Sequence, residues 1–131
     1  MSKRDWLKTL GWTEDHTTEI RNTAYAYIRQ GKYDTALPFF EALVVLDPNN
    51  SYDVQMLGAL YVQTNQPEKA IKYLNRALQF DAEHGPTLLN MTKAFFMSGR
   101  IDEGLRLAKL LQNDADPYIA GNAAALILCY S

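Results

Sequence analysis

The sequence predicts an all-α superhelix of about three helix-turn-helix repeats, with a short helical segment before them and a capping helix after them. Two observations lead to this prediction: residues of like kind recur every 34 positions, and prolines mark the junctions between helices. Gly31 and Gly99 lie two such steps apart, and Asn65, which also tolerates left-handed backbone, lies midway between them. With 131 residues, of which 47% are apolar, the chain is long enough for one compact domain.

Small side chains recur with the same period at three positions, Ala36, Ala70 and Gly104. Two antiparallel helices can approach closely only where a side chain is nearly absent, so we expect helix pairs to cross at these positions. Aromatic rings recur at another position, where Tyr27 and Tyr61 are expected to pack between the two helices of a unit.

Helix boundaries follow from prolines and capping residues. Pro67, Pro86 and Pro117 suit a first helical turn, where a missing amide hydrogen costs little, and Ser51 and Asp116 are the expected N-caps. The predicted repeats occupy residues 14–114, with helix pairs at 14–30 and 34–46, 51–64 and 67–80, and 86–98 and 101–113. The single domain, 1–131, is completed by an N-terminal segment at 1–13 and a capping helix within 115–131. The residues spaced to cover the last unit are Ile119, Ala123, Leu126 and Ile127.

The repeat resembles the tetratricopeptide repeat (TPR). Gly31-Lys32-Tyr33-x-x-Ala36, with Phe40 and Pro48, matches its second half, and Leu57-Gly58-x-x-Tyr61, with Ala70 and Ala77, matches a nearly complete unit. The third unit, from Met91 to Leu111, is degenerate. The resemblance implies that the first helix of each pair lines a concave side.

Residues on this concave side form the expected partner-binding groove. The resemblance assigns to it Arg21, Tyr25, Ile28, Tyr52, Gln55, Ala59, Val62, Leu89, Lys93 and Phe96. Tyr25, Tyr52 and Phe96 are the expected anchors, because aromatic rings offer a large contact area at low entropy cost. The alternative is that each ring is half-buried core. Arg21 alone fits the polar pattern with which some TPR co-chaperones hold an acidic C-terminal tail, so that kind of clamp is disfavoured.

The run from Gly31 to Pro48, together with Leu57-Gly58-Ala59-x-Tyr61 and the chain length, resembles the small TPR chaperones of bacterial type III secretion. This resemblance implies a cytoplasmic chaperone that binds and stabilises an extended segment of an export substrate, either a translocator or a needle subunit, before secretion. The alternative is a generic TPR scaffold that joins folded proteins in a multiprotein complex.

The N-terminal segment places Trp6 and Leu10 four residues apart, hence on one face of a helix. It either caps the first unit or mediates a homodimer; in the translocator chaperones the N-terminal helix is often the dimer contact. A small co-chaperone is a further partner of this kind.

Composition disfavours several other classes of function. A net charge of -2 gives the chain no excess of positive charge with which to bind nucleic acid. The longest apolar stretches fall short of the roughly 20 residues that cross a bilayer. His16 and His84 are isolated and no phosphate-binding loop is present, so we expect no enzyme, no metal site and no cofactor. Cys129 is the only cysteine, which excludes an internal disulfide, and we expect it to be a small core residue.

Overall fold

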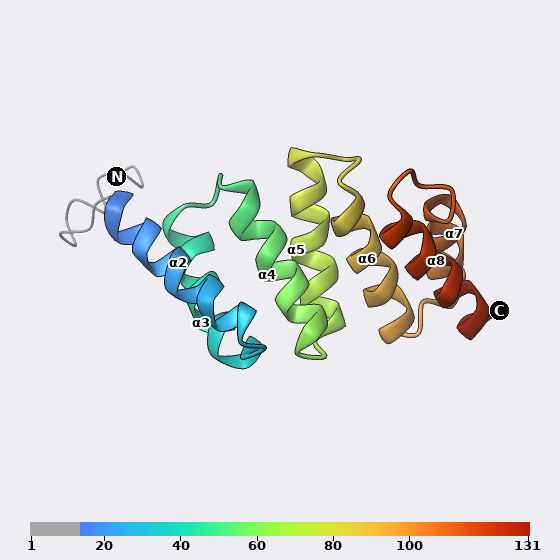
Figure 1. Ribbon diagram of the computed structural model, residues 1–131, viewed down its shortest axis with the longest axis horizontal. Helices are drawn as coiled ribbons and strands as arrows, with labels where there is room; N and C mark the ends of the chain where they lie inside the picture. Colours follow the sequence, from blue (N-terminus) through green and yellow to red (C-terminus); the bar gives the residue numbers. More distant parts are fainter. Residues whose placement is uncertain (1–13) are drawn as a thin grey trace.

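A computed structural model describes residues 14–131, and these form seven helices stacked along one axis, from α2 at one end to α8 at the other (Figure 1). Their bounds are α2 Glu14–Arg29, α3 Tyr33–Leu46, α4 Ser51–Gln63, α5 Pro67–Phe80, α6 Gly85–Met97, α7 Ile101–Leu111 and α8 Pro117–Tyr130. The described residues contain no strand. The predicted all-α architecture of three helix pairs followed by one further helix is therefore confirmed.

The turn inside each helix pair has the same conformation. Gly31, Asn65 and Gly99 have φ angles of 73°, 59° and 81°, the left-handed conformation that ends a helix. After each of them the chain folds back in the same way: the amide of Lys32 donates to the carbonyl of Tyr27 over 2.9 Å, and equivalent bonds follow one and two repeats later. The 34-residue period of the sequence is thus a period of backbone geometry.

Close crossings inside the pairs occur at small residues, as predicted. Ala36 and Ala70 are fully buried. A Cβ atom added to Gly58 of α4 would lie 2.6 Å from Leu74 of α5, and one added to Gly104 of α7 would lie 2.7 Å from Phe96 of α6. Both glycines are therefore required by the helix that packs against them.

One continuous core runs through α2 to α6, and a smaller cluster joins α6, α7 and α8. Tyr27 stacks on Phe39 and Tyr61 lies against Tyr73, so both repeat tyrosines pack between the helices of their units, as expected. Ile119 and Ala123 are the residues of α8 buried in the smaller cluster.

The helix starts lie within one residue of those predicted, and one of the two predicted N-caps is correct. The Asp116 carboxylate caps α8 by accepting from the amide of Tyr118 over 2.9 Å. Ser51, however, is the first residue of α4, and Asn50 is its N-cap, accepting from the amide of Asp53 over 3.0 Å. The prediction for Ser51 was wrong by one residue because both side chains can accept this bond, and the backbone leaves the helix at Asn50.

Candidate partner-binding surface

The first helices of the units, α2, α4, α6 and α8, form one row, here called the inner row. Helix α6 contacts both α4 and α8, whereas α2 and α4, and the neighbouring helices of the other row, α3, α5 and α7, share few or no backbone contacts. Helices that lie closer together are on the inner side of a curved stack. The inner row is therefore the counterpart of the concave side that the sequence predicted.

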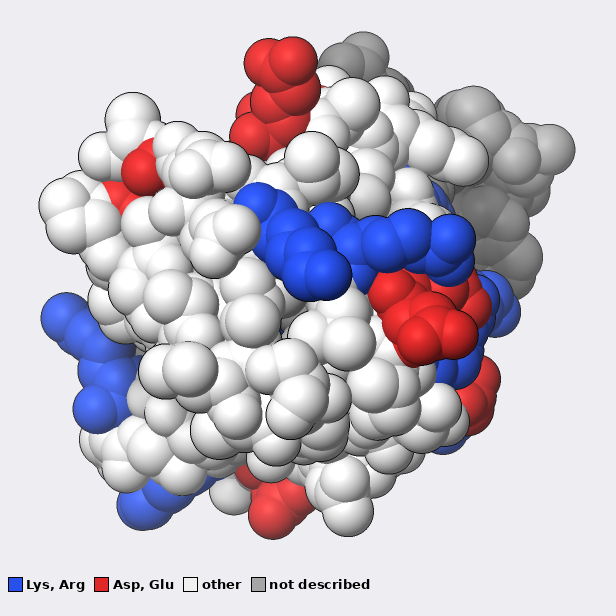
Figure 2. Space-filling view, turned by 90° about the vertical axis from the view of Figure 1, so that its right-hand side faces the viewer, with Lys and Arg blue, Asp and Glu red and all other residues white. Residues whose placement is uncertain are grey.

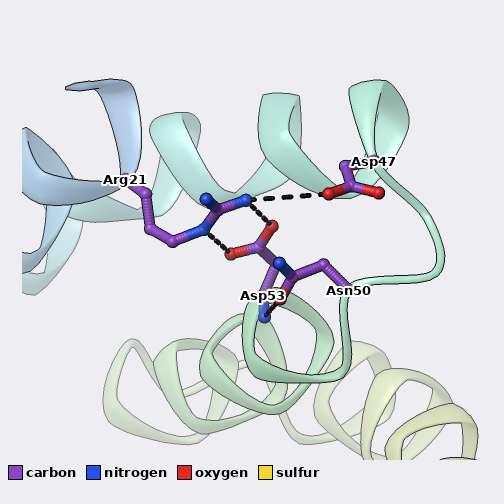
Figure 3. Close-up of polar contacts among 4 residues, drawn as sticks. All are labelled: Arg21, Asp47, Asn50 and Asp53. Atoms are coloured by element: carbon purple, nitrogen blue, oxygen red, sulfur yellow. Dashed lines mark hydrogen bonds and ion pairs between the residues drawn. The ribbon is translucent and has the colours of Figure 1, made fainter. Parts of the chain in front are cut away.

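A buried ion pair links the first two helices of this row. The guanidinium of Arg21, from α2, makes two hydrogen bonds of 2.7 Å to the two carboxylate oxygens of Asp53, from α4, and lies 3.9 Å from Asp47 (Figure 3). Asp53 is fully buried, and its amide is bonded to the side chain of Asn50. The hydrogen bond to Asp53 raises the pKa of Arg21, against the opposing effect of burial.

This pairing gives Arg21 a structural role. A buried carboxylate is costly without a cation, and the planar guanidinium meets it in the two-point geometry that suits arginine. Arg21 thus neutralises Asp53 and ties α2 to α4, a role that the sequence did not reveal. Its predicted contact with a client remains a prediction, but one side of its guanidinium is already used within the chain.

Tyr25 and Tyr52 present accessible rings beside this ion pair. Tyr25 is 44% exposed and lies under the guanidinium of Arg29, 5.1 Å from the ring centre. Tyr52 is also exposed, and its ring meets the edge of buried Phe40 at 6.2 Å. Burial, followed by the proximity of Tyr25 and Asp53, raises the pKa of Tyr52. The N-terminal half of the inner row thus carries two neutral aromatic rings around a neutralised charge pair.

Four further predicted groove residues have partly exposed side chains. They are Ile28, Gln55, Ala59 and Lys93. Together with the two tyrosines they give a surface of mixed aromatic, aliphatic and polar character, and Met97, near its C-terminal end, is exposed.

Three predicted groove residues are buried instead: Val62, Leu89 and Phe96. Phe96 is only 5% exposed, and its ring stacks on Tyr130 of α8 with centres 4.1 Å apart and planes within 5°. Leu89 belongs to the cluster that joins α6 to α8. In this structure these side chains are core residues and not an open lining. Helix α8 covers Leu89 and Phe96 because it packs against α6 as well as α7, whereas Val62 belongs to the core that runs through α2 to α6.

The sequence did contain a signal for this burial. Tyr130 follows Phe96 by one repeat step, and Val62 precedes Phe96 by the same step. Residues at the same repeat position of neighbouring first helices lie beside one another. The aromatic ring of Tyr130 therefore indicates that α8 corresponds to the first helix of a fourth unit.

An apolar hollow at the N-terminal end of the stack was not predicted. It lies between α2 and α3, is lined by Ile20, Pro38, Phe39 and Ala42, and has a volume of about 340 Å³. A second hollow beside it adds His16, Glu19 and Thr23 to the lining. Trp6 and Leu10, the predicted dimer or cap residues, lie outside the residues that the structure describes.

Cys129 is exposed on α8, so the expectation that it is a core residue was wrong. Within residues 14–131, no helix is long and apolar enough to cross a membrane. The same residues contain no group of three or more His, Cys, Asp or Glu side chains placed to hold a metal ion.

Solved structures of similar fold include two bacterial chaperones. PcrH, in complex with the chaperone binding region of PopD, is 22% identical, with a TM-score of 0.75 over 92% of this chain and 94% of that chain. The type III secretion translocator chaperone SycD of Yersinia enterocolitica is 20% identical, with a TM-score of 0.71 over 94% and 96% of the two chains. A third structure, the second TPR domain of human RPAP3 in complex with an HSP70 peptide, is 16% identical, with a TM-score of 0.70 over 82% and 91%. At these identities the likeness is one of fold.

Comparison with curated proteins gives no match. A family profile described as "Anaphase-promoting complex, cyclosome, subunit 3" matches residues 29–109, which is more than half of the chain. These residues span the turn of the first unit to the second helix of the third, the part of the chain in which the 34-residue period is found. The chain therefore belongs to this TPR-like family.

Proposed function

We propose that this protein is a type III secretion chaperone, which holds an extended segment of an export substrate, a translocator or needle subunit, along its inner row in the bacterial cytosol. The observation that carries the proposal is the pair of exposed rings, Tyr25 and Tyr52, on neighbouring helices of that row. Apolar side chains of an unassembled subunit would bury themselves against these rings, which removes the surface that drives premature assembly. No cofactor enters this mechanism.

Two further observations support the proposal. The solved structures of similar fold include a chaperone bound to a region of its client and a translocator chaperone. The ion pair with Asp53 already uses the charge of Arg21 within the chain, so this cation is less available to hold an acidic tail.

The experiment begins with co-purification of the tagged protein and identification of the bound protein by mass spectrometry. Overlapping synthetic peptides of that protein are then titrated against the wild-type chain and its variants. Tyr25→Ala and Tyr52→Ala should each weaken binding of the best peptide by roughly 1–3 kcal/mol. Phe80→Ala is the matched control, because Phe80 is 43% exposed but lies on α5, outside the inner row.

A secreted or filament-forming bacterial protein, bound through a peptide that needs both tyrosines, would support the chaperone. Unchanged binding by both folded tyrosine variants would remove the assignment of these anchors.

The second candidate is a TPR scaffold in a multiprotein complex. It is favoured by the family description, which names a subunit of a large assembly. A scaffold would retain folded cytosolic proteins and bind none of their isolated peptides, so the same titration separates the two candidates.

A further inference from the structure

Helix α8 carries an exposed stripe that nothing in the described chain covers. Tyr118, Gly121, Ala125 and Leu128 are all exposed, and their spacing of three, four and three residues keeps them within an arc of about 80° at 100° per residue. The buried residues Ile119 and Ala123 lie on the opposite side of the helix. Leu128, at the end of the stripe, is 82% exposed.

The surroundings of this stripe are uncharged. Helix α8 contains no Lys, Arg, Asp or Glu. Figure 2 looks onto this end of the stack and shows a broad uncharged area with basic and acidic side chains around its edges. The end of a helical array normally needs a polar outer face to stay soluble, and α8 lacks one.

The fold of one chain does not explain Gly121. A glycine within a helix costs about 1 kcal/mol relative to alanine. Gly58 and Gly104 each face a packed side chain that leaves no room for a Cβ atom, whereas a Cβ added to Gly121 would meet nothing within 4 Å. No contact within the described chain therefore requires this glycine, and its open position leaves room for a helix to approach closely from outside.

Repeat equivalence shows that this face is normally covered. One step of 34 residues before Gly121, Ala125 and Leu128 lie three buried residues of α6, and two steps before them lie three buried residues of α4. These residues are Thr87, Met91 and Ala94 in α6, and Asp53, Leu57 and Leu60 in α4. The interior helices bury this face against other helices, and α8 is left with it open.

The stripe is complementary to itself. When two copies of α8 run antiparallel about a two-fold axis level with Ala123, Tyr118 of each copy meets Leu128 of the second copy. Gly121 then meets Ala125, so the small residues lie at the centre, where the helices can approach closely, and the large residues close both ends. A two-fold axis also sets like charges of the two copies near one another, and α8 has none to repel.

We propose that the chain forms an antiparallel homodimer through this stripe of α8. The contact is short, because a helix of 14 residues is only about 21 Å long. The dimer is therefore weak, with a dissociation constant expected in the micromolar range. It leaves Tyr25 and Tyr52 accessible.

Sedimentation velocity of the full chain, from low micromolar to submillimolar concentration, tests the dimer. The wild-type chain should shift from monomer to dimer, and Leu128→Asp should raise the dissociation constant at least tenfold while the far-ultraviolet circular dichroism stays unchanged. Val45→Asp is the matched control, because Val45 is 76% exposed on α3, and it should leave the constant unchanged. Removal of residues 1–13 should also leave it unchanged.

A wild-type chain that stays monomeric would overturn the proposal and would leave the stripe to a helix of a different protein. Loss of the dimer on removal of residues 1–13, with no effect of Leu128→Asp, would overturn it in favour of the N-terminal segment.

The antiparallel register has its own test. In a Cys129→Ser background, the double change Gly121→Cys with Ala125→Cys should give a covalent dimer on mild oxidation, because each new thiol faces one of the second copy. Ala124→Cys alone, at the margin of the stripe, is the control. Equal cross-linking by the control and the double variant would contradict the register.

Discussion

The two halves of the inner row carry the same repeat but offer different surfaces. In the N-terminal half, between α2 and α4, Tyr25 and Tyr52 are exposed around the ion pair of Arg21 and Asp53. In the C-terminal half, between α6 and α8, the ring of Phe96 is stacked under Tyr130 and covered. Residues on one face of a repeat therefore bind a partner or join the core according to the helix that lies beside them.

The halves also differ in what joins their helices. A charge pair with directional bonds joins α2 to α4, whereas apolar contact and ring stacking join α6 to α8. The first kind of junction fails when one charge is left alone, and the second weakens gradually as contact area is lost. Three substitutions test this contrast, in order of expected effect.

Arg21→Ala should cause the largest loss, about 3 kcal/mol or more of unfolding free energy, because it leaves the fully buried Asp53 without its cation. Urea denaturation at neutral pH measures this loss. Arg29→Ala is the control, since Arg29 is exposed and contacts the exposed ring of Tyr25, and this change should cost less than about 1 kcal/mol. Equal losses in the two variants would show that the ion pair contributes little.

Alkaline pH should weaken the N-terminal half to a smaller extent. Because burial raises the pKa of Tyr52 in the folded chain, the folded state favours the neutral hydroxyl; its contribution is complete below pH 10 and is lost as pH rises above 10. The free energy of unfolding should fall by less than about 1.4 kcal/mol per pH unit, since the ring is partly exposed. Between pH 9 and 11 the melting temperature should fall less steeply for Tyr52→Phe than for the wild-type chain. The control, Tyr118→Phe, should show the same fall as the wild-type chain.

Tyr130→Ala should have the smallest effect on stability, about 0.5–1.5 kcal/mol, through loss of the stack on Phe96. Amide hydrogen exchange should become faster in α8 and in the C-terminal turn of α6, and remain unchanged in α2 and α4. Tyr118→Ala is the control at low protein concentration, because Tyr118 is on the same helix and is more exposed than Tyr130, 67% against 41%. Uniformly faster exchange along the chain would contradict a local role for Tyr130.

The sequence predicted what depends on local geometry. Gly31, Asn65 and Gly99 require left-handed backbone whatever surrounds them, so their spacing located the turns and the helix pairs. The partner of Arg21 lies 32 residues away on another helix, and only packing brings the two together. The cover over Phe96 likewise depends on how far α8 folds back along the inner row, which periodicity alone does not determine. Seven of the ten predicted groove residues are therefore exposed or partly exposed, and three, Val62, Leu89 and Phe96, are buried.

The repeated turn has a consequence for the length of the array. Since the turns at Gly31, Asn65 and Gly99 close with the same pair of backbone hydrogen bonds, each 34-residue unit enters and leaves its turn in the same orientation. A duplicate of residues 51–84 inserted after residue 84 would leave α6 with the same preceding helix. The buried Asp53 of the copy, however, would lack its arginine, because Gln55 occupies the repeat position of Arg21. The reach of the inner row can thus change in steps of one helix pair, on condition that the copy of Asp53 is replaced by an uncharged residue.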